Sequence, residues 1–273
     1  MSFALAPEAL AAGYGLASFE TIGSTSTEAM QRLKAGEAGP LWVAAAEQTA
    51  GRGRRGSVWR DPAGNLSTTL AVRLDLHPST LATLGFVAGV ALVRALVRCA
   101  SAETAPQNNT DERPTFQLKW PNDVLAGGAK LAGILLETEQ LGAGRGVVIG
   151  IGVNVVRAPD GLPYRAASLH ELGIPVSAEL LFRAVSAEWT GAYAAWDEGR
   201  GFPSIRAAWL RHAAGLGGPV AVRGRAEDVA GTFETIDEAG QLVVKEADGS
   251  RRTIAAGDVH FGEAATIRPG VAA

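Results

Sequence analysis

"KWPNDVLAGGAKLAGILLE", residues 119–137, is the stretch of this sequence that decides both the fold and the site. Residues 116–120 read as a strand, and Pro121 ends it because proline cannot donate to a sheet ladder. Two apolar runs around a Gly-Gly pair then predict a β-hairpin over 123–141. Polar side chains at strand ends often build sites. This stretch presents three candidates, two at the strand end and one on the hairpin: Asn122, Asp123 and Lys130.

A second motif, "GRGRRG" at 51–56, alternates glycines with arginines. Glycine lets backbone amides approach a ligand closely, and arginine offers a planar fork for phosphate or carboxylate. The motif is not a Walker loop, because the Gly-Lys-Ser/Thr ending is missing, and it lacks the strand–GxGxxG–helix context of a dinucleotide fold. By itself it fits an anion-binding loop and an ordinary basic surface loop equally well. Together with Asp123, which can hold magnesium or a substrate amide, and Lys130, which offers a charge for phosphate, it favours an anion-binding site.

The rest of the chain divides into helix and strand patterns. "GSTSTEAMQRLKAG" predicts a helix that Ser24 or Thr25 caps and Gly36 ends. Apolar spacing predicts strands at 41–48, 65–74 and 146–156, helices at 80–100, 177–199 and 202–213, and loops at 102–115 and 158–167. After residue 216, four short strand-like runs separated by turns predict a small β-barrel. The expected domains are 1–215 and 216–273.

Composition indicates a globular protein and excludes several classes. Hydrophobic residues make up 47% and charged residues 19% of 273 residues, and the net charge of −3 argues against a nucleic-acid partner. The single cysteine, Cys99, excludes an intramolecular disulfide and a cysteine zinc cluster. The N-terminus has no basic region typical of a secretory signal. The apolar run 87–100 contains Arg94 and Arg98 and is expected to be too short to span a membrane. We therefore expect a cytoplasmic location.

Four motifs occur together in an order and spacing that are specific to one enzyme family: "GRGRRGSVW", "KWPND", "KLAGILLE" and "GIGVNV". From Thr21 onward the chain resembles the biotin–protein ligases (biotin–[acetyl-CoA-carboxylase] ligases), in the short form without an N-terminal DNA-binding domain. The resemblance implies an α+β fold, with a central mixed β-sheet flanked by helices as in class II aminoacyl-tRNA synthetases and lipoate ligases. A small C-terminal β-barrel of the Src-homology type is expected to follow.

The activity implied by the resemblance has two steps. Biotin and MgATP form biotinyl-5′-AMP, and one lysine of a biotin carboxyl carrier protein then takes the biotin. Biotin carboxylate and ATP repel each other, so the chemistry requires neutralisation and positioning more than acid–base catalysis. Histidine is not needed for this, and the four histidines lie outside the motifs: His77, His170, His212 and His260.

The resemblance also implies which residues bind biotin. Ser24 and Thr25 match the pair that hydrogen-bonds the ureido ring, and Gln48 matches a glutamine near the reacting carboxylate. Gly133 leaves room for the bicyclic ring, and the glycine-arginine loop is expected to close over it. The expected biotin-binding residues are Ser24, Thr25, Gln48, Gly51, Arg52, Gly53, Arg54, Lys130, Leu131, Gly133, Ile134, Gly150 and Gly152.

A second set is implied for ATP and the adenylate. Asp123, supported by Asn122, would organise magnesium and the phosphates, and Lys130 would stabilise charge at the α-phosphate. Trp59 would pack beneath the closed loop, and Asn154 would face the adenylate. The expected residues are Arg54, Arg55, Trp59, Asn122, Asp123, Lys130 and Asn154. The expected catalytic residues are Lys130, Arg52 and Asp123, and the expected magnesium ligand is Asp123.

The chain departs from the family pattern at three points. The pattern begins near Thr21, which leaves no room for a helix-turn-helix domain and argues against repressor activity. The loop after "GIGVN" lacks the tryptophan that stacks on adenine in some members, and Tyr164 is the candidate substitute. The C-terminal "AAGDVHFGEA" lacks the arginine that some members carry after the acidic residue.

Three other functions would each require different features of the sequence. A lipoate–protein ligase would share the fold but not this combination of motifs. A non-catalytic biotin- or adenylate-binding protein would be expected to lack Asp123 or Lys130. A nucleic-acid-binding module would be basic and would carry aromatic residues within the arginine run, where only Trp59 is near. The family includes monomers and homodimers, and the sequence does not distinguish them.

Overall fold

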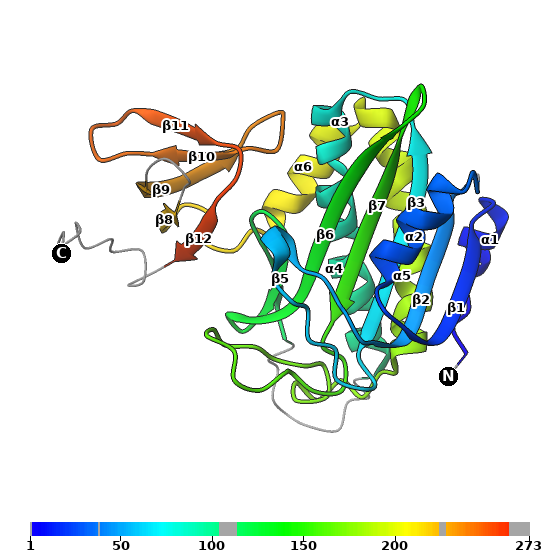
Figure 1. Cartoon of the computed structure of the whole chain (residues 1–273). Helices are drawn as coiled ribbons and strands as arrows, with labels where there is room; N and C mark the ends of the chain where they lie inside the picture. Colours follow the sequence, from blue (N-terminus) through cyan, green and yellow to red (C-terminus); the bar gives the residue numbers. More distant parts are fainter. Residues whose placement is uncertain (1, 38, 104–113, 224–227, 262–273) are drawn as a thin grey trace.

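The architecture is taken from a computed structural model that describes residues 2–37, 39–103, 114–223 and 228–261. A seven-stranded sheet with the order β1-β2-β3-β7-β6-β5-β4 forms its centre (Figure 1). β1 and β2 pair in parallel and all other neighbours pair antiparallel, so the expected mixed central sheet is confirmed. The strands are β1 (Gly15–Ile22), β2 (Leu41–Gln48), β3 (Leu66–Leu74), β4 (Phe116–Lys119), β5 (Asp123–Ala126), β6 (Ala129–Leu141) and β7 (Gly144–Val153).

Helices cover both faces of this sheet (Figure 1). The helix α2 (Thr25–Lys34) connects β1 to β2 and lies on one face, whereas α4 (Leu84–Glu103) and α5 (Ala178–Trp196) pack together on the other. As predicted, a capping side chain begins α2: Ser24 accepts a hydrogen bond from the backbone N–H of Thr27 at 3.4 Å. The shorter helices are α1 (Pro7–Ala11), α3 (Pro78–Ala82) and α6 (Phe202–Arg211).

Strand β2 shows how the sequence builds a core on each face. Side chains alternate between the two faces of a strand. Trp42 and Ala44 therefore join the large cluster beneath α4 and α5, where Trp42 meets Phe182 edge-to-face at 5.7 Å. Leu41 and Val43 point to the smaller cluster beneath α2. Because both faces are covered, the strand is an almost continuous apolar run.

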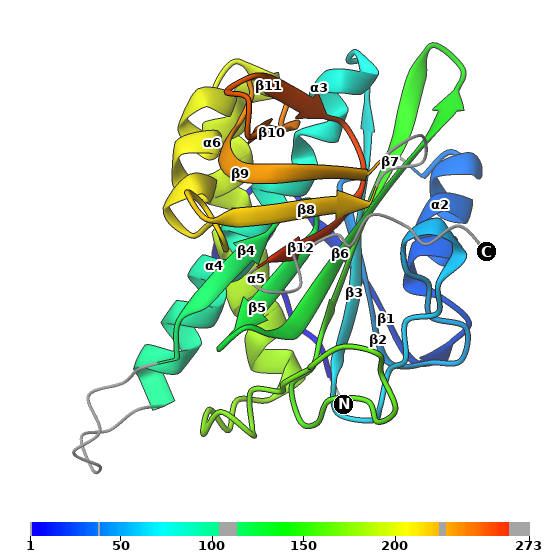
Figure 2. The same ribbon diagram turned by 90° about the vertical axis from the view of Figure 1, so that its left-hand side faces the viewer.

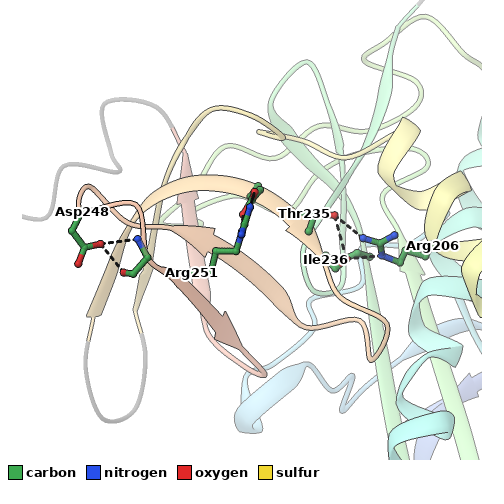
Figure 3. A network of polar contacts seen from close by, with 7 residues as sticks. Arg206, Thr235, Ile236, Asp248 and Arg251 are labelled. Carbon is green, nitrogen blue, oxygen red and sulfur yellow. Dashed lines mark hydrogen bonds and ion pairs between the residues drawn. The ribbon is translucent and has the colours of Figure 1, made fainter.

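A second, five-stranded antiparallel sheet follows α6, in the order β11-β10-β9-β8-β12. Figures 1 and 2 show it beside the β4–β5 edge of the large sheet. Arg206 of α6 donates to the carbonyl of Ile236 at 2.5 Å and to Thr235 Oγ1 at 2.8 Å (Figure 3). The indole N–H of Trp120 donates to the carbonyl of Gly240 at 2.9 Å, next to the β4–β5 turn. The strands are β8 (Pro219–Arg223), β9 (Asp228–Ile236), β10 (Leu242–Lys245), β11 (Arg251–Ile254) and β12 (Asp258–Phe261).

Most predicted elements are present, but the N-terminal region was incompletely predicted. The predicted strand 41–48 is β2, and the hairpin 123–141 is β5 with β6. The sequence reading missed α1 and β1, because "GLASFETI" is a half-exposed edge strand with a weak apolar signal. The four runs expected after residue 216 correspond to five strands among the residues that the structure describes. The loop expected at 102–115 begins later, after α4, and 104–113 lie outside the described residues.

The helical stretch Pro78–Ala102 corrects one expectation. By length and composition it could cross a membrane, because the helical stretch that contains the apolar run 87–100 is 25 residues long. However, 72% of its most apolar window is buried inside the protein, where α4 packs against α5 and the sheet. The core helix of a folded domain has the same length and composition, so the stretch is weak evidence for a membrane span.

Candidate active site

A cavity of ≈ 750 Å³ opens over β3, β6 and β7, beneath the glycine-arginine loop (51–61) and beside the 158–167 loop. Segments far apart in the sequence meet in its lining. Most of the predicted site residues are among them: Thr25, Gln48, Arg52, Gly53, Arg54, Arg55, Trp59, Asn122, Asp123, Lys130, Gly133, Ile134, Gly150 and Gly152.

The glycine-arginine loop folds back on itself as a short hairpin. The backbone N–H of Trp59 donates to the carbonyl of Gly51 at 3.0 Å, and the N–H of Gly53 donates to the carbonyl of Ser57 at 2.7 Å. A Cβ at Gly51 would lie 2.5 Å from the carbonyl oxygen of Trp59, so any other residue would force the two backbone segments apart. The arginines therefore project from a defined hairpin.

Each loop arginine contacts an acceptor on a different part of the protein. These contacts attach the loop to β6, to the β4–β5 turn and to the C-terminal sheet. A ligand carboxylate or phosphate could replace such acceptors, because guanidinium groups bind both in the same geometry. The pairs are Arg52 with Glu137, Arg54 Nη1 with Asn122 Oδ1 at 3.0 Å, and Arg55 Nη1 with Asp258 Oδ2 at 2.7 Å.

Two cations near the cavity are partly desolvated. Burial lowers the pKa of Arg54, and the neighbouring charge of Arg55 lowers it further, against the opposing effect of Asp123 and Asp258. Burial likewise lowers the pKa of Lys119, again opposed by Asp123. A desolvated cation is stabilised by an anion placed beside it. This part of the cavity is therefore suited to a negatively charged ligand.

A β-bulge directs Lys130 into the cavity. The pairing of β5 with β6 shifts register between Val124 and Leu125, which leaves Leu131 without an opposing residue. A bulge of this kind re-aims the neighbouring side chains. Lys130 and Gly133 consequently both line the cavity, whereas Leu131 is fully buried in the core.

The ammonium group of Lys130 is surrounded on several sides. Its Nζ lies 2.7 Å from Asp123 Oδ1, and the side chains of this ion pair are only 21% and 19% exposed. The ring centroids of Trp59 and Tyr164 lie 5.8 Å and 5.5 Å from Nζ, within the range of cation–π attraction. The backbone N–H of Lys130 also donates to the carbonyl of Arg165 at 2.8 Å, which ties the 158–167 loop to β6. Lys130 is thus held at the cavity wall.

Trp59 packs on a surface made of glycine. A Cβ at Gly152 would lie 2.4 Å from Trp59 Cε2, and one at Gly133 would lie 3.2 Å from Cζ3. The indole therefore needs a residue without a side chain at Gly152. The room left by these glycines is shared between the indole, at the base of the loop hairpin, and the cavity beside it.

Neutral hydroxyl and amide groups form the floor of the cavity. Gln48 Oε1 accepts from the backbone N–H of Thr25 at 2.8 Å and from its hydroxyl at 3.0 Å. Gln48 Nε2 donates to Ser67 Oγ at 2.8 Å. Such a floor can offer both donors and acceptors to an uncharged polar ligand group. The floor residues are Thr25, Ser26, Gln48, Ser67 and Thr68.

Four predicted site residues do not line this cavity. Ser24 caps α2, Gly51 lines a neighbouring cleft, and Leu131 lies in the core. Asn154 is 2% exposed and donates to the carbonyl of Ala167 at 3.1 Å, which holds the 158–167 loop next to β7. The ligand contacts predicted for these four residues stay predictions.

The sequence reading also missed several residues of the site. The signal for the floor was present in β3, where Ser67, Thr68 and Thr69 interrupt an otherwise apolar and buried strand. Asp61 gave no signal, although burial raises its pKa and hydrogen bonds from Ser67 and Gln48 oppose that shift. The lining residues that were not predicted include Ser26, Ser67, Thr68, Leu135 and Asp258.

The carboxylate of Asp123 is the expected magnesium ligand of the cavity. Among the residues that the structure describes, no group of three or more His, Cys, Asp or Glu side chains could hold a metal ion. Magnesium is usually bound by one or two carboxylates together with the phosphates of a substrate. Asp123, at the cavity wall beside Lys130, fits an ion that arrives with ATP.

Comparison with known proteins identifies the class to which this fold and site belong. The sequence profile of the biotin/lipoate A/B protein ligase family matches residues 18–154, and that of the biotin protein ligase C-terminal domain matches 215–262. The chain belongs to the biotin/lipoate A/B protein ligase family.

Individual relatives show which members of the family this chain is similar to. A protein of Paracoccus denitrificans named biotin–[acetyl-CoA-carboxylase] ligase is 40% identical over 250 residues, which covers 88% of this chain and 97% of that protein. A protein of the same name from Mycobacterium tuberculosis is 32% identical over 273 residues, with 93% of each chain covered. The biotin protein ligase of Aquifex aeolicus, solved with biotin and ATP, has a TM-score of 0.73 at 23% identity and covers 91% of this chain and 99% of its own. That likeness supports the fold.

Proposed function

We propose that this chain is an ATP-dependent biotin–protein ligase, which forms biotinyl-5′-AMP and transfers biotin to a lysine of a carrier protein. One observation carries the proposal: a single cavity joins a cluster of cations to a floor of neutral hydrogen-bonding groups. Biotin has a carboxylate at one end and an uncharged ureido ring at the other, so the two parts of the cavity match its two ends. The names of the relatives above support the same function.

The cations act in the first step. An oxygen of the biotin carboxylate attacks the α-phosphorus of ATP, and the bond from that phosphorus to the bridging oxygen breaks as pyrophosphate leaves. Both reactants are negative, so Lys130, Arg52 and Arg54 neutralise them and stabilise the charge that develops on the phosphoryl oxygens. Binding in one cavity also supplies the in-line geometry of the attack.

The loop acts between the two steps. In the second step the neutral amine of the acceptor lysine attacks the carbonyl carbon of the mixed anhydride, AMP leaves, an amide forms, and the amine loses a proton. The anhydride is also reactive toward water. A closed glycine-arginine loop, held by Arg52, Arg54 and Arg55, would exclude water until the acceptor arrives.

Further parts of the proposal concern ATP. Asp123 would hold magnesium together with the phosphates, and the ion would neutralise phosphate charge. Tyr164 lines the cavity, and the residue is 48% exposed, so its ring is available to stack on adenine in place of the family's tryptophan.

The acceptor and the location complete the proposal. We infer a biotin carboxyl carrier protein as acceptor, because both named relatives are ligases of acetyl-CoA carboxylase. A cytoplasmic location would bring the enzyme to that acceptor. A homodimer, which the family allows, would be tested by sedimentation with and without biotin.

Mass spectrometry of a carrier domain tests the function directly. The domain is incubated with this protein, MgATP and either biotin or lipoate. We expect the mass of one biotin to be added, and no gain with lipoate. Modification by lipoate alone would favour the lipoate ligase, and binding of biotin without any pyrophosphate release would favour a non-catalytic binding protein.

A further inference from the structure

We propose that Asp61 is a positioning residue: it fixes the direction of the Ser67 hydroxyl, at one end of a chain of hydrogen bonds beneath the cavity, so that the floor selects a ligand head group carrying N–H donors. This inference rests on the proposed function, because it assigns the recognition of the biotin ring to a carboxylate that does not line the main cavity. Asp61 instead lines a neighbouring cleft of ≈ 490 Å³, and Gln48 lines both.

The chain begins at the carboxylate. Ser67 Oγ donates to Asp61 Oδ2 at 2.6 Å, and Gln48 Nε2 donates to Ser67 Oγ at 2.8 Å. The orientation of the Gln48 amide is fixed independently, because its Oε1 accepts from the backbone N–H of Thr25 at 2.8 Å and a backbone N–H can only donate. Nε2 must therefore face Ser67. Ser67 accepts that bond, and its own single proton goes to Asp61.

The chain continues on the other side of Gln48. The hydroxyl of Thr25 donates to Gln48 Oε1 at 3.0 Å, and Thr69 Oγ1 donates to Thr25 Oγ1 at 2.9 Å. Ser26 Oγ lies 3.1 Å from Thr69 Oγ1. Since the proton of Thr69 is already used, Ser26 is the donor in this contact. Every hydroxyl in the chain thus points its proton toward Gln48 or Asp61.

This direction decides what the floor offers to a ligand. A hydroxyl has one proton and two lone pairs, whereas an ionised carboxylate can only accept. Ser26, Thr25 and Ser67 have committed their protons, so the capacity they keep toward the cavity is that of acceptors. A Cβ at Gly150 would lie 2.7 Å from Ser26 Oγ, so the glycine leaves that hydroxyl uncovered. The floor therefore suits a ring with N–H groups.

The ureido ring of biotin has two N–H donors, whereas the dithiolane ring of lipoate has none. Acceptors buried by a ring that cannot donate would lose their hydrogen bonds to water without replacement. The directed chain therefore distinguishes the two substrates of this family by donor count, in addition to shape. Without Asp61 the proton of Ser67 is free to turn toward the cavity, where it would oppose a ligand N–H.

Calorimetric titration with three variants tests the proposal. Asp61→Leu removes the acceptor and keeps the branched shape of the side chain, Asp61→Asn keeps an oxygen that Ser67 can donate to, and Asp160→Asn is the control. Asp160 lines the same cleft as Asp61 but takes no part in the chain. We expect Asp61→Leu to weaken biotin binding about tenfold or more, as for a buried group left unsatisfied. Asp61→Asn should restore most of the affinity, and Asp160→Asn should match the wild type.

Two further measurements separate positioning from a loss of structure. A biotin analogue methylated at both ureido nitrogens has no donors, so its weak binding should be the same in the wild type and Asp61→Leu. In steady-state assays of folded Asp61→Leu, KM for biotin should rise while kcat and KM for ATP stay unchanged. If this variant does not fold, Ser67→Ala breaks the chain at its next member and should give the same pattern.

The outcomes are distinct. Biotin binding by folded Asp61→Leu within twofold of the wild type would overturn the inference, as would an equal loss for biotin and its methylated analogue. If the wild type binds and transfers biotin and Asp61→Leu has the same biotin affinity and the same KM for biotin, only this inference fails. A wild type that binds no biotin would instead remove the proposed function.

Discussion

The loop above the cavity and the floor beneath it differ in charge, exposure and direction. The loop presents arginines whose side chains are partly exposed, with Arg52 and Arg55 in ion pairs to Glu137 and Asp258. The floor presents neutral hydroxyls that are almost fully buried, such as Thr25 and Ser67. Exposed charges are screened and can exchange one anion for another, whereas buried hydrogen bonds are specific for donor and acceptor. The comparison indicates that the loop retains the bound adenylate and that the floor selects the ligand by its hydrogen-bonding groups. The predictions below test that division, from the largest expected effect to the smallest.

The largest effect is expected at Lys130, where the loop side and the reacting atoms meet. Lys130→Ala should lower the rate of adenylate formation about a hundredfold or more, because a preorganised charge is lost from the transition state. Pyrophosphate release with biotin and MgATP measures this. Lys34→Ala is the control, since Lys34 pairs with Glu139 at 2.8 Å on an exposed surface. An unchanged rate of pyrophosphate release in the Lys130 variant would show that Lys130 has no role in adenylate formation.

Gly152→Ala should come next, because it disturbs the packing between loop and floor. The new Cβ would lie 2.4 Å from the Trp59 indole, which must shift and carry the loop with it. We expect biotin to bind about tenfold more weakly or worse, as for overpacking of a filled site. Gly191→Ala is the matched control, since a Cβ there meets nothing within 4 Å. Calorimetry measures the affinity, and normal binding by Gly152→Ala would mean that Trp59 moves freely.

Arg52→Ala should affect the retention of biotinyl-AMP more than the selection of the ligand. Removing its contact with Glu137 weakens closure, so biotinyl-AMP should dissociate about fivefold faster, as for the loss of one partly exposed charge-assisted contact. Stopped-flow release of the adenylate checks this. Arg73→Ala serves as the control, because Arg73 donates to the carbonyl of Leu141 and does not line the cavity. A dissociation rate equal to wild type would show that closure does not need this arginine.

The smallest effect is expected for the pair of Arg55 with Asp258, which joins the loop to β12. Both side chains are largely exposed, at 38% and 61%. A double-mutant cycle on the two residues should give a coupling below about 1 kcal/mol in the binding of ATP. A cycle on Arg251 and Glu234, within the C-terminal sheet, should give no coupling to ATP. A much larger coupling between Arg55 and Asp258 would show that the C-terminal sheet takes part in closing the glycine-arginine loop.

The sequence predicted the loop side of the cavity better than the floor. Arg52, Arg54, Arg55 and Lys130 could be found because the glycine-arginine run and the stretch 119–137 together favour an anion-binding site. Asp61 could not, since an aspartate before a proline reads as an ordinary turn. Its role depends on burial and on the position of Ser67, which only the folded strand β3 provides.

Strand periodicity explains the other differences. The run at 41–48 was predicted because both faces of β2 are buried and the signal is continuous. The strand β1 was missed because one edge of the sheet leaves its side chains half exposed. Leu131 was expected at the cavity because the family resemblance places it in the apolar wall of the biotin site, and simple alternation would put it on the same face as Gly133. The bulge interrupts that alternation, and no residue type at this position indicates a bulge.

The bulge at Leu131 makes the position of the Lys130 ammonium group depend on the number of residues in β6. Deletion of Ala129 would allow β5 and β6 to pair without the bulge, with Leu131 opposite Leu125 and Lys130 opposite Ala126, and the side chain of Lys130 would then turn to the opposite face of the strand. Such a deletion would inactivate the protein as fully as replacing the lysine, although every functional side chain would still be encoded. Replacement of Leu131 by another large apolar residue would leave the amine in place. In this hairpin, insertions and deletions are therefore more damaging than substitutions.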